Sequence, residues 1–305
     1  MYLADRIAEA PSRIGVELRG KVWLLPGPSS FADAVAHCSS RYILQDDVQD
    51  ACCQLAERWP DLLDTANTRL RAPMDGAWIE WTDPDVGEQV GMLVSTDGEG
   101  RAGALRVFWT QGGELNVAQG AVLFDFNRAV NFTHAEGSPT YRLRALPAAY
   151  VGMKNHLALA IDEPWADYFR ATALGPHGLP EASSICGERL WPDVVWALAF
   201  FVLLASRMPF MERPILRGRL NLSRARAGKR ALLDHVELRL GQVGIADGHD
   251  GGAGAGGRKH PRLHMVRGHL VRRRDSVFWR CAHIRGGASG DSAAPITRHV
   301  TLRKG

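Results

Sequence analysis

In the first 72 residues the apolar positions recur mainly at the three- and four-residue spacing of a helix. The clearest stripe consists of Val48, Cys52, Leu55 and Trp59, and Pro60 ends it. Before residue 27 the pattern is weak. We therefore predict one short strand at 21–25, a helix that begins at Phe31, and two further helices at 46–59 and 61–70.

After Pro73 the apolar period changes to two, which is typical of strands. Four alternating runs, separated by turn-forming segments, predict an antiparallel meander: 78–81, 89–95, 103–109 and 121–126. These runs carry six aromatic residues, which suit either a core or a surface that stacks bases: Trp78, Trp81, Phe108, Trp109, Phe124 and Phe126. Because Glu80 and Asp125 stand among them and would repel phosphate, we predict a core.

The rest of the chain begins with a weakly patterned stretch, residues 127–183. A run that is apolar on all sides then extends from Pro192, in its first turn, to Met208 and predicts a buried helix. The remaining expected elements are a short basic helix or turn at 221–230, a strand at 235–240, a glycine-rich loop at 241–257, a hairpin of two runs at 263–271 and 277–284, and a last strand at 296–302.

Together these patterns predict an α+β fold with N-terminal helices, a central antiparallel meander, and a buried helix packed on a basic C-terminal antiparallel sheet. The chain of 305 residues is long enough for more than one domain. We expect three parts: a helical segment at 1–72, a β-rich region at 73–183, and a helix plus basic sheet at 184–305.

The composition indicates an ordinary globular protein of the cytoplasm. Five cysteines without a CxxC pair favour reduced thiols. The first residues lack an apolar signal core, so we expect no secretion. The most apolar run, 194–205, is shorter than the roughly 20 residues that span a bilayer, so we expect no membrane partner.

The net charge of +4 conceals a division between the two ends of the chain. Residues 217–305 contain 19 Lys and Arg against 6 Asp and Glu, a net charge of +13, which leaves −9 for residues 1–216. Such an asymmetry favours contact with a polyanion. The alternative is a solvated basic face, or one that docks onto the acidic half of the same chain.

Cationic and imidazole groups concentrate in the hairpin between residues 262 and 286. Arginine and lysine on a sheet bind a phosphate backbone, and an aromatic ring stacks a base. We predict that the hairpin binds nucleic acid through His264, Arg267, Arg272, Arg273, Trp279, Arg280 and Arg285. Arg267 and His269 will lie beside Trp279, His283 and Arg285 if the strand register brings their faces together.

Three other interpretations of the hairpin stay open. His269 and His283 would serve as base and acid of a metal-independent endoribonuclease, because imidazole titrates near neutral pH. A zinc site would use His264, His269, Cys281, His283 and His299, but their spacing matches no short zinc signature, so we predict no metal. In the third interpretation these residues are only structural: the histidines cap and pack a small sheet, and the arginines form its solvated edge.

Other candidate chemistries are weaker still. The glycine-rich loop is followed by no apolar helix, and no Walker A loop occurs, so we predict no nucleotide cofactor. Cys52 and Cys53 fit a helix stripe better than a redox site. Asp162, Glu163 and Asp167 are acidic enough for a hard cation but lack a second ligand set, so we interpret them as surface residues.

Three blocks of the chain resemble an uncharacterised family of phage and prophage proteins. They are residues 72–81 with 90–94, residues 220–229, and the motif His264-x-Val266-Arg267-Gly268-His269 with Trp279 and His283-Ile284-Arg285-Gly286. Arg280, Cys281 and Ala282 depart from the pattern, where a proline-containing, more aromatic run is expected. The resemblance implies a phage-derived, cytosolic setting and no particular activity.

The leading prediction is a non-catalytic, nucleic-acid-contacting protein related to phage or prophage. The endoribonuclease is the alternative. A further alternative is a phage assembly or host-factor-binding protein whose basic end meets an acidic protein partner.

Overall fold

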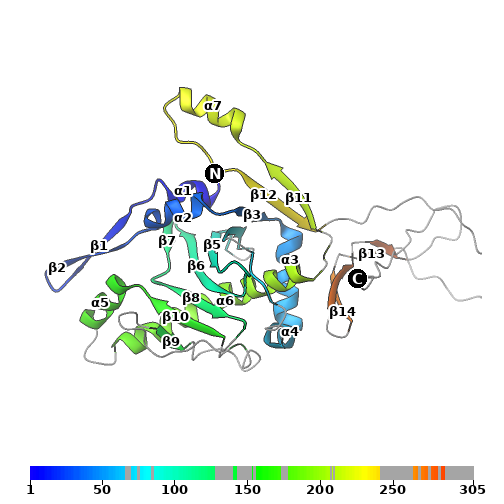
Figure 1. Cartoon of the computed structure of the whole chain (residues 1–305), viewed down its shortest axis with the longest axis horizontal. Coiled ribbons are helices and arrows are strands. Elements are labelled where there is room, and N and C mark those ends of the chain that lie inside the picture. The colour runs from blue at the N-terminus through cyan, green and yellow to red at the C-terminus, as the bar shows by residue number, and fades with distance from the viewer. Residues whose placement is uncertain are drawn as a thin grey trace, which may run out of the picture.

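The computed structural model has at its centre one ten-stranded mixed sheet with helices on both faces (Figure 1). It describes residues 1–65, 70–73, 76–83, 86–127, 140–142, 153, 156–172, 178–206, 208, 210–240, 264–266, 269–273, 276–280 and 283–285. The strands of the sheet are β3 (Ser40–Leu44), β4 (Ala77–Thr82), β5 (Gln89–Thr96), β6 (Ala102–Gln111), β7 (Glu114–Val117), β8 (Gly120–Asp125), β9 (Thr140–Arg142), β10 (Leu157–Ile161), β11 (Phe210–Ile215) and β12 (His235–Leu240).

The strand order is β11-β12-β3-β4-β5-β6-β8-β10-β9, with β7 beside β6. Strand β3 pairs in parallel with β12 and with β4, whereas the other neighbours are antiparallel. The sheet therefore runs through all three predicted parts of the chain, and the boundaries between those parts stay a prediction. The α+β class is confirmed.

Alternate residues of the sheet enter two separate cores. Ile79 and Trp81 of β4 belong to the larger core, with α3 (Asp46–Arg58), α4 (Pro60–Thr65), α5 (Glu163–Thr172) and α6 (Gly178–Ala205). Trp78 points to the smaller core, with α1 (Leu3–Ile7), the 3-10 helix η1 (Pro28–Phe31) and α2 (Ala32–Ala36). A separate hairpin, β1 (Arg13–Leu18) with β2 (Lys21–Pro26), packs Trp23 edge-on against Tyr168 of α5. Because both faces of the sheet are covered at its centre, strands β4 and β5 are buried along most of their length.

The predicted meander is present as β4, β5, β6 and β8, and its aromatic residues form cores as expected. Five of the six are buried, and Trp109 packs against the larger core from a partly exposed position. Trp81 stacks on Trp196 of α6 with ring centroids 4.2 Å apart. The five buried rings therefore belong to the interior and cannot stack bases.

The predicted buried helix is correct in type but wrong in its start. Helix α6 begins at Gly178 rather than near Trp191, and Pro192 lies inside it. The segment ahead of Pro192 is helical because Leu179, Cys186 and Leu190 recur on its buried side, a stripe that the proline obscured. No helix in the described part of the chain is long and apolar enough to cross a membrane.

The C-terminal part is divided differently from the expectation. Strand β12 occurs where predicted but joins the large sheet instead of a separate basic sheet. The elements that the sequence patterns missed are α1, β1, β3, β7, β9, β10, α5 and β11. The predicted loop at 241–257 and the last strand at 296–302 lie outside the described residues.

A buried carboxylate attaches the N-terminal helix to the sheet. Glu80 of β4 is 2% exposed and accepts the backbone N–H groups of Leu3 at 2.6 Å and Ala4 at 3.1 Å. It also accepts the indole N–H of Trp78 at 3.0 Å. The first N–H groups of a helix lack partners within the helix, so an acidic side chain satisfies them. Burial raises the pKa of Glu80, and the three donated hydrogen bonds oppose that rise.

Replacing this carboxylate by an amide should destabilise the protein. Glu80→Gln keeps the shape but leaves at least one of the three buried donors without an acceptor, at a cost of about 1–3 kcal/mol. The free energy of unfolding from denaturant titration measures it. Glu17→Gln, at an exposed position of β1, is the matched control and should stay within about 0.5 kcal/mol of the unmodified protein. Equal effects of the two substitutions would contradict this role of Glu80.

Candidate nucleic-acid interface

The cation-rich segment forms a two-stranded antiparallel hairpin, as predicted. Strand β14 (His269–Arg273) pairs with β15 (Ser276–Arg280), and β13 (His264–Val266) pairs with β16 (His283–Arg285). Both pairs have the same register, and two residues, 274 and 275, connect Arg273 to Ser276. We call residues 264–285 the basic hairpin.

One face of the basic hairpin packs on the helices of the larger core. Leu270 of β14 is 2% exposed and Val277 of β15 is 4% exposed, and both belong to that core. The backbone N–H of Leu270 donates to Oε1 of Gln54 on α3 at 3.2 Å. Burial of these two side chains and the hydrogen bond fix the hairpin to the body of the protein.

An ion pair strengthens this docking. Nη1 of Arg272 lies 2.9 and 2.7 Å from the two carboxylate oxygens of Asp61 on α4. Arg272 was predicted to bind nucleic acid, but in the structure its charge is directed to the acidic half of the chain. Both side chains are partly exposed, so the pair orients the hairpin and contributes only about 0–1 kcal/mol.

The opposite face of the basic hairpin points outward and remains cationic. Residues directly across an antiparallel pair share a face, so His269 and Val271 lie on one side with Phe278 and Arg280. Arg273 is exposed on this side, and His269, Val271 and Phe278 are partly exposed. We call this surface, formed by His269, Val271, Arg273 and Phe278 and by the position of Arg280, the outer face.

The register separates several residues that the sequence had grouped. Trp279 pairs with buried Leu270, so its backbone position lies on the docked side and not beside His269. The aromatic residue on the outer face is Phe278, which the sequence analysis overlooked. Strand alternation places Phe278 and Leu270 on opposite faces, but it does not say which face is outward. Phe278 could be assigned to the outer face only because Leu270 is known to face the core.

The remaining predicted residues lie at the far end of the hairpin from its turn. His264 pairs with Arg285, so these two positions come together. His283 pairs with Val266, whereas His269 pairs with Arg280, so the two histidines belong to different strand pairs. Arg267 lies outside the described residues.

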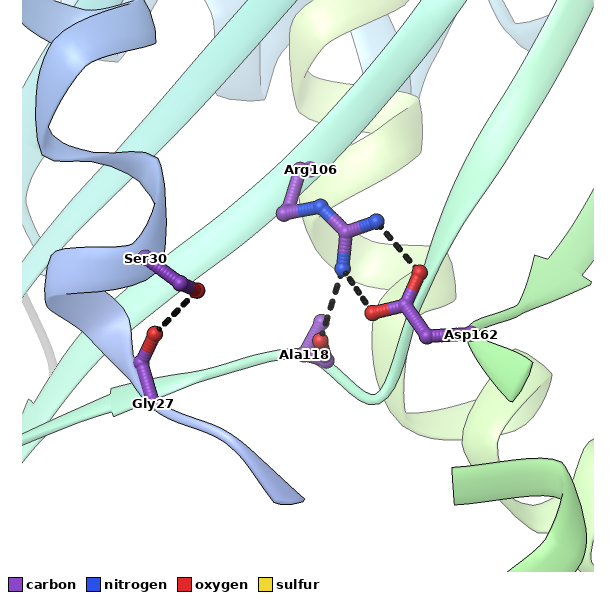
Figure 2. Close-up of polar contacts among 5 residues, drawn as sticks. All are labelled: Gly27, Ser30, Arg106, Ala118 and Asp162. Carbon is purple, nitrogen blue, oxygen red and sulfur yellow. Dashed lines mark hydrogen bonds and ion pairs between the residues drawn. The ribbon is translucent and has the colours of Figure 1, made fainter. Parts of the chain in front are cut away.

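The described residues offer no metal site. They contain no group of three or more His, Cys, Asp or Glu arranged to hold an ion, and Cys281 and His299 of the zinc hypothesis lie outside them. Figure 2 shows how the acidic cluster is used instead: Arg106 donates to both carboxylate oxygens of Asp162, at 2.8 and 2.7 Å, and to the carbonyl of Ala118. Asp162 is thus the partner of an arginine.

The vicinal cysteines are also structural. Cys52 is fully buried in the larger core, and burial raises the pKa of its thiol well above the usual value. A thiol that stays protonated is a poor nucleophile and a poor metal ligand. The interpretation of this pair as part of a helix stripe is confirmed for Cys52.

One carboxylate that lies away from the hairpin has a strongly raised pKa. Burial raises the pKa of Asp193 on α6 to about 7, and the nearby charge of Asp83 adds to the rise. An acid that titrates near neutral pH suits proton transfer. Within the described residues, the two aspartates do not belong to a group of three or more His, Cys, Asp or Glu residues that could hold a metal ion.

Comparisons of the chain with protein-family models, with curated proteins and with solved structures gave no match. The function is therefore inferred from the residues of this chain and their contacts.

The docked position of the hairpin predicts unequal effects for two neighbouring substitutions. Leu270→Ala removes a buried side chain and should lower the free energy of unfolding by about 2–4 kcal/mol. Val271→Ala, one residue along the same strand and on the outer face, should cost less than about 1 kcal/mol. Chemical denaturation measures both. A larger loss for Val271→Ala would mean that the faces are assigned the wrong way round.

Proposed function

We propose that this chain is a phage- or prophage-related protein that contacts nucleic acid, without catalysis, through the outer face of the basic hairpin. One observation carries the proposal: the hairpin uses its Leu270 and Val277 side to dock on the helices, which leaves a cationic and aromatic side presented to solvent. A surface held in place in this way binds with little loss of conformational entropy.

The outer face has the groups that a single strand requires. Arg273 supplies a charge for the phosphate backbone, and Phe278 supplies a ring on which a base can stack. His269 adds a hydrogen-bonding group, and Arg280 is its partner across the ladder. Neither contact needs a particular base, so we expect modest sequence preference.

The register favours binding over the ribonuclease alternative. General acid–base cleavage requires both imidazoles within hydrogen-bond reach of one phosphodiester. His269 and His283 belong to different strand pairs, β14 with β15 and β13 with β16. The endoribonuclease therefore stays a prediction that a cleavage assay decides.

The cellular setting is part of the proposal. Cys38, Cys52 and Cys186 are free thiols, which suits a reducing cytoplasm. The resemblance to phage and prophage proteins supports the same setting. An acidic protein partner for the basic end is the competing possibility, and it predicts no salt-dependent affinity for nucleic acid.

Arg273→Gln should weaken binding of labelled single-stranded RNA or DNA. Loss of one phosphate contact should lower the slope of log K against log salt concentration by about 0.7. Arg272→Gln is the matched control, because it removes the same charge from the next residue while its native contact is to Asp61. Fluorescence anisotropy across a salt series measures both variants.

Equal slopes for Arg273→Gln and the unmodified protein, with the fold intact, would remove the outer face as the binding surface. The same samples, run on a denaturing gel with chelator present, report on cleavage. Intact RNA supports a binder. Cleavage that His269→Ala abolishes would establish the ribonuclease instead.

A further inference from the structure

A helical arm lies between β11 and β12, and of its residues only the last, Leu233, packs against a core, from a partly buried position. Helix α7 (Gly218–Arg226) has no buried residue, and the chain returns from it to β12 at His235. Figure 1 shows α7 projecting beyond the body, well separated from β13 and β14. We call residues 216–233 the arm. Core packing does not account for it.

The arm is uniformly basic. It contains six arginine and lysine residues and no aspartate or glutamate: Arg217, Arg219, Arg224, Arg226, Lys229 and Arg230. The sequence predicts a basic helix or turn at this place but no function for that element. Such a run repels itself unless an anion neutralises it.

The arm is held rigidly despite its exposure. The side-chain amide of Asn221 donates to the carbonyl of Leu232 and accepts its N–H, both at 2.8 Å. Arg224 donates to the carbonyl of Arg230 at 2.7 Å. These bonds connect the inner side of α7 to the returning chain.

The arm is also braced against α1. Arg230 donates to the carbonyl of Ala8 at 3.1 Å, and the N–H of Leu233 donates to Asp5 at 2.8 Å. At the other end of the arm, the N–H of Arg217 donates to Asp234. A fixed arm presents its charges without a further ordering cost on binding.

The side chains of three cations of the arm make no hydrogen bond, ion pair or cation–π contact with any described residue: Arg219, Arg226 and Lys229. Arg219 and Arg226 are seven residues apart, so they lie on one face of α7 about 10 Å apart along its axis. This face is opposite to the one that holds Asn221 and Arg224. Arg219 and Arg226 therefore point away from the returning chain, and Lys229 is exposed after the end of α7.

The exposed leucines of the arm do not form one continuous apolar face on its helix. Leu216 is exposed ahead of α7, and Leu220 and Leu222 are two positions apart on the helix and so lie on different faces. A helix that lies in a membrane surface needs one continuous apolar face. A protein interface usually has an apolar, aromatic centre, and the arm contains no aromatic residue.

We propose that the arm is a second nucleic-acid-binding surface that contacts the phosphate backbone through Arg219, Arg226 and Lys229. The proposal rests on the proposed function in that both surfaces bind nucleic acid, but it uses different residues. Because phosphate contacts carry no base information, the arm should add affinity and salt dependence but no sequence preference.

The test is anisotropy of labelled single-stranded DNA with the full chain across a salt series. Arg219→Gln/Arg226→Gln should lower the salt slope by about 1.4, two phosphate contacts at about 0.7 each. Arg13→Gln/Arg189→Gln removes the same charge from exposed positions elsewhere and should leave the slope unchanged. Arg219→Lys/Arg226→Lys keeps the charge and should restore the slope.

The two proposals fail separately. A normal slope for the arm variant beside a reduced slope for Arg273→Gln would overturn the arm and keep the outer face. A reduced slope for the arm variant beside a normal one for Arg273→Gln would do the reverse. Binding of the arm to phosphatidylserine vesicles, with no effect of the arm variant on DNA, would also overturn the arm proposal.

Discussion

The buried carboxylate of Glu80 is the interaction on which much of the structure depends. It fixes the first turn of α1 to the central strand β4 through the N–H groups of Leu3 and Ala4. Helix α1 in turn braces the arm, because Asp5 and the carbonyl of Ala8 hold the returning chain. Tyr2 packs edge-on against His235 at the start of β12, with ring centroids 4.4 Å apart. One hydrogen-bonded carboxylate thus supports both a core and the base of an exposed surface.

The opposite face of the sheet supports the other basic surface in a comparable way. There Leu270 packs in the larger core with α3 and α4. Gln54 of α3 accepts the backbone N–H of Leu270, and Asp61 of α4 pairs with Arg272. Asp47 accepts the N–H of Leu240 at the end of β12. The acidic half of the chain therefore holds the basic half through specific contacts. Docking onto the acidic half of the chain applies to Arg272, whereas Arg219 and Arg273 are exposed.

Periodicity in the sequence was enough to find the elements whose pattern is local. The meander, α3, β12 and the hairpin with its short turn follow from apolar spacing and turn residues alone. Strand β3 was missed because its five residues, Ser40–Leu44, are too few to establish a period and gain their partners from β4 and β12 far along the chain. The start of α6 was misplaced because Pro192 resembles a helix beginning.

The proposed binding surface was only partly predictable, because it also depends on contacts between segments far apart in the sequence. Strand alternation divides a hairpin into two faces, but only tertiary packing decides which face is buried. Because Leu270 is buried, Arg272 and the position of Trp279 lie on the docked side, and Phe278 lies on the outer face. Likewise, the arm's hydrogen bonds, not its composition, determine which of its cations are free.

Hydrogen–deuterium exchange of the intact protein with and without single-stranded DNA tests most directly whether the outer face and the arm bind nucleic acid. Binding at these two surfaces predicts slower exchange at amides of residues 269–273, 276–280 and 218–230, with the meander strands β5 and β6 unchanged. Saturating DNA that leaves the hairpin and the arm unaltered, or that protects only other segments, would contradict it.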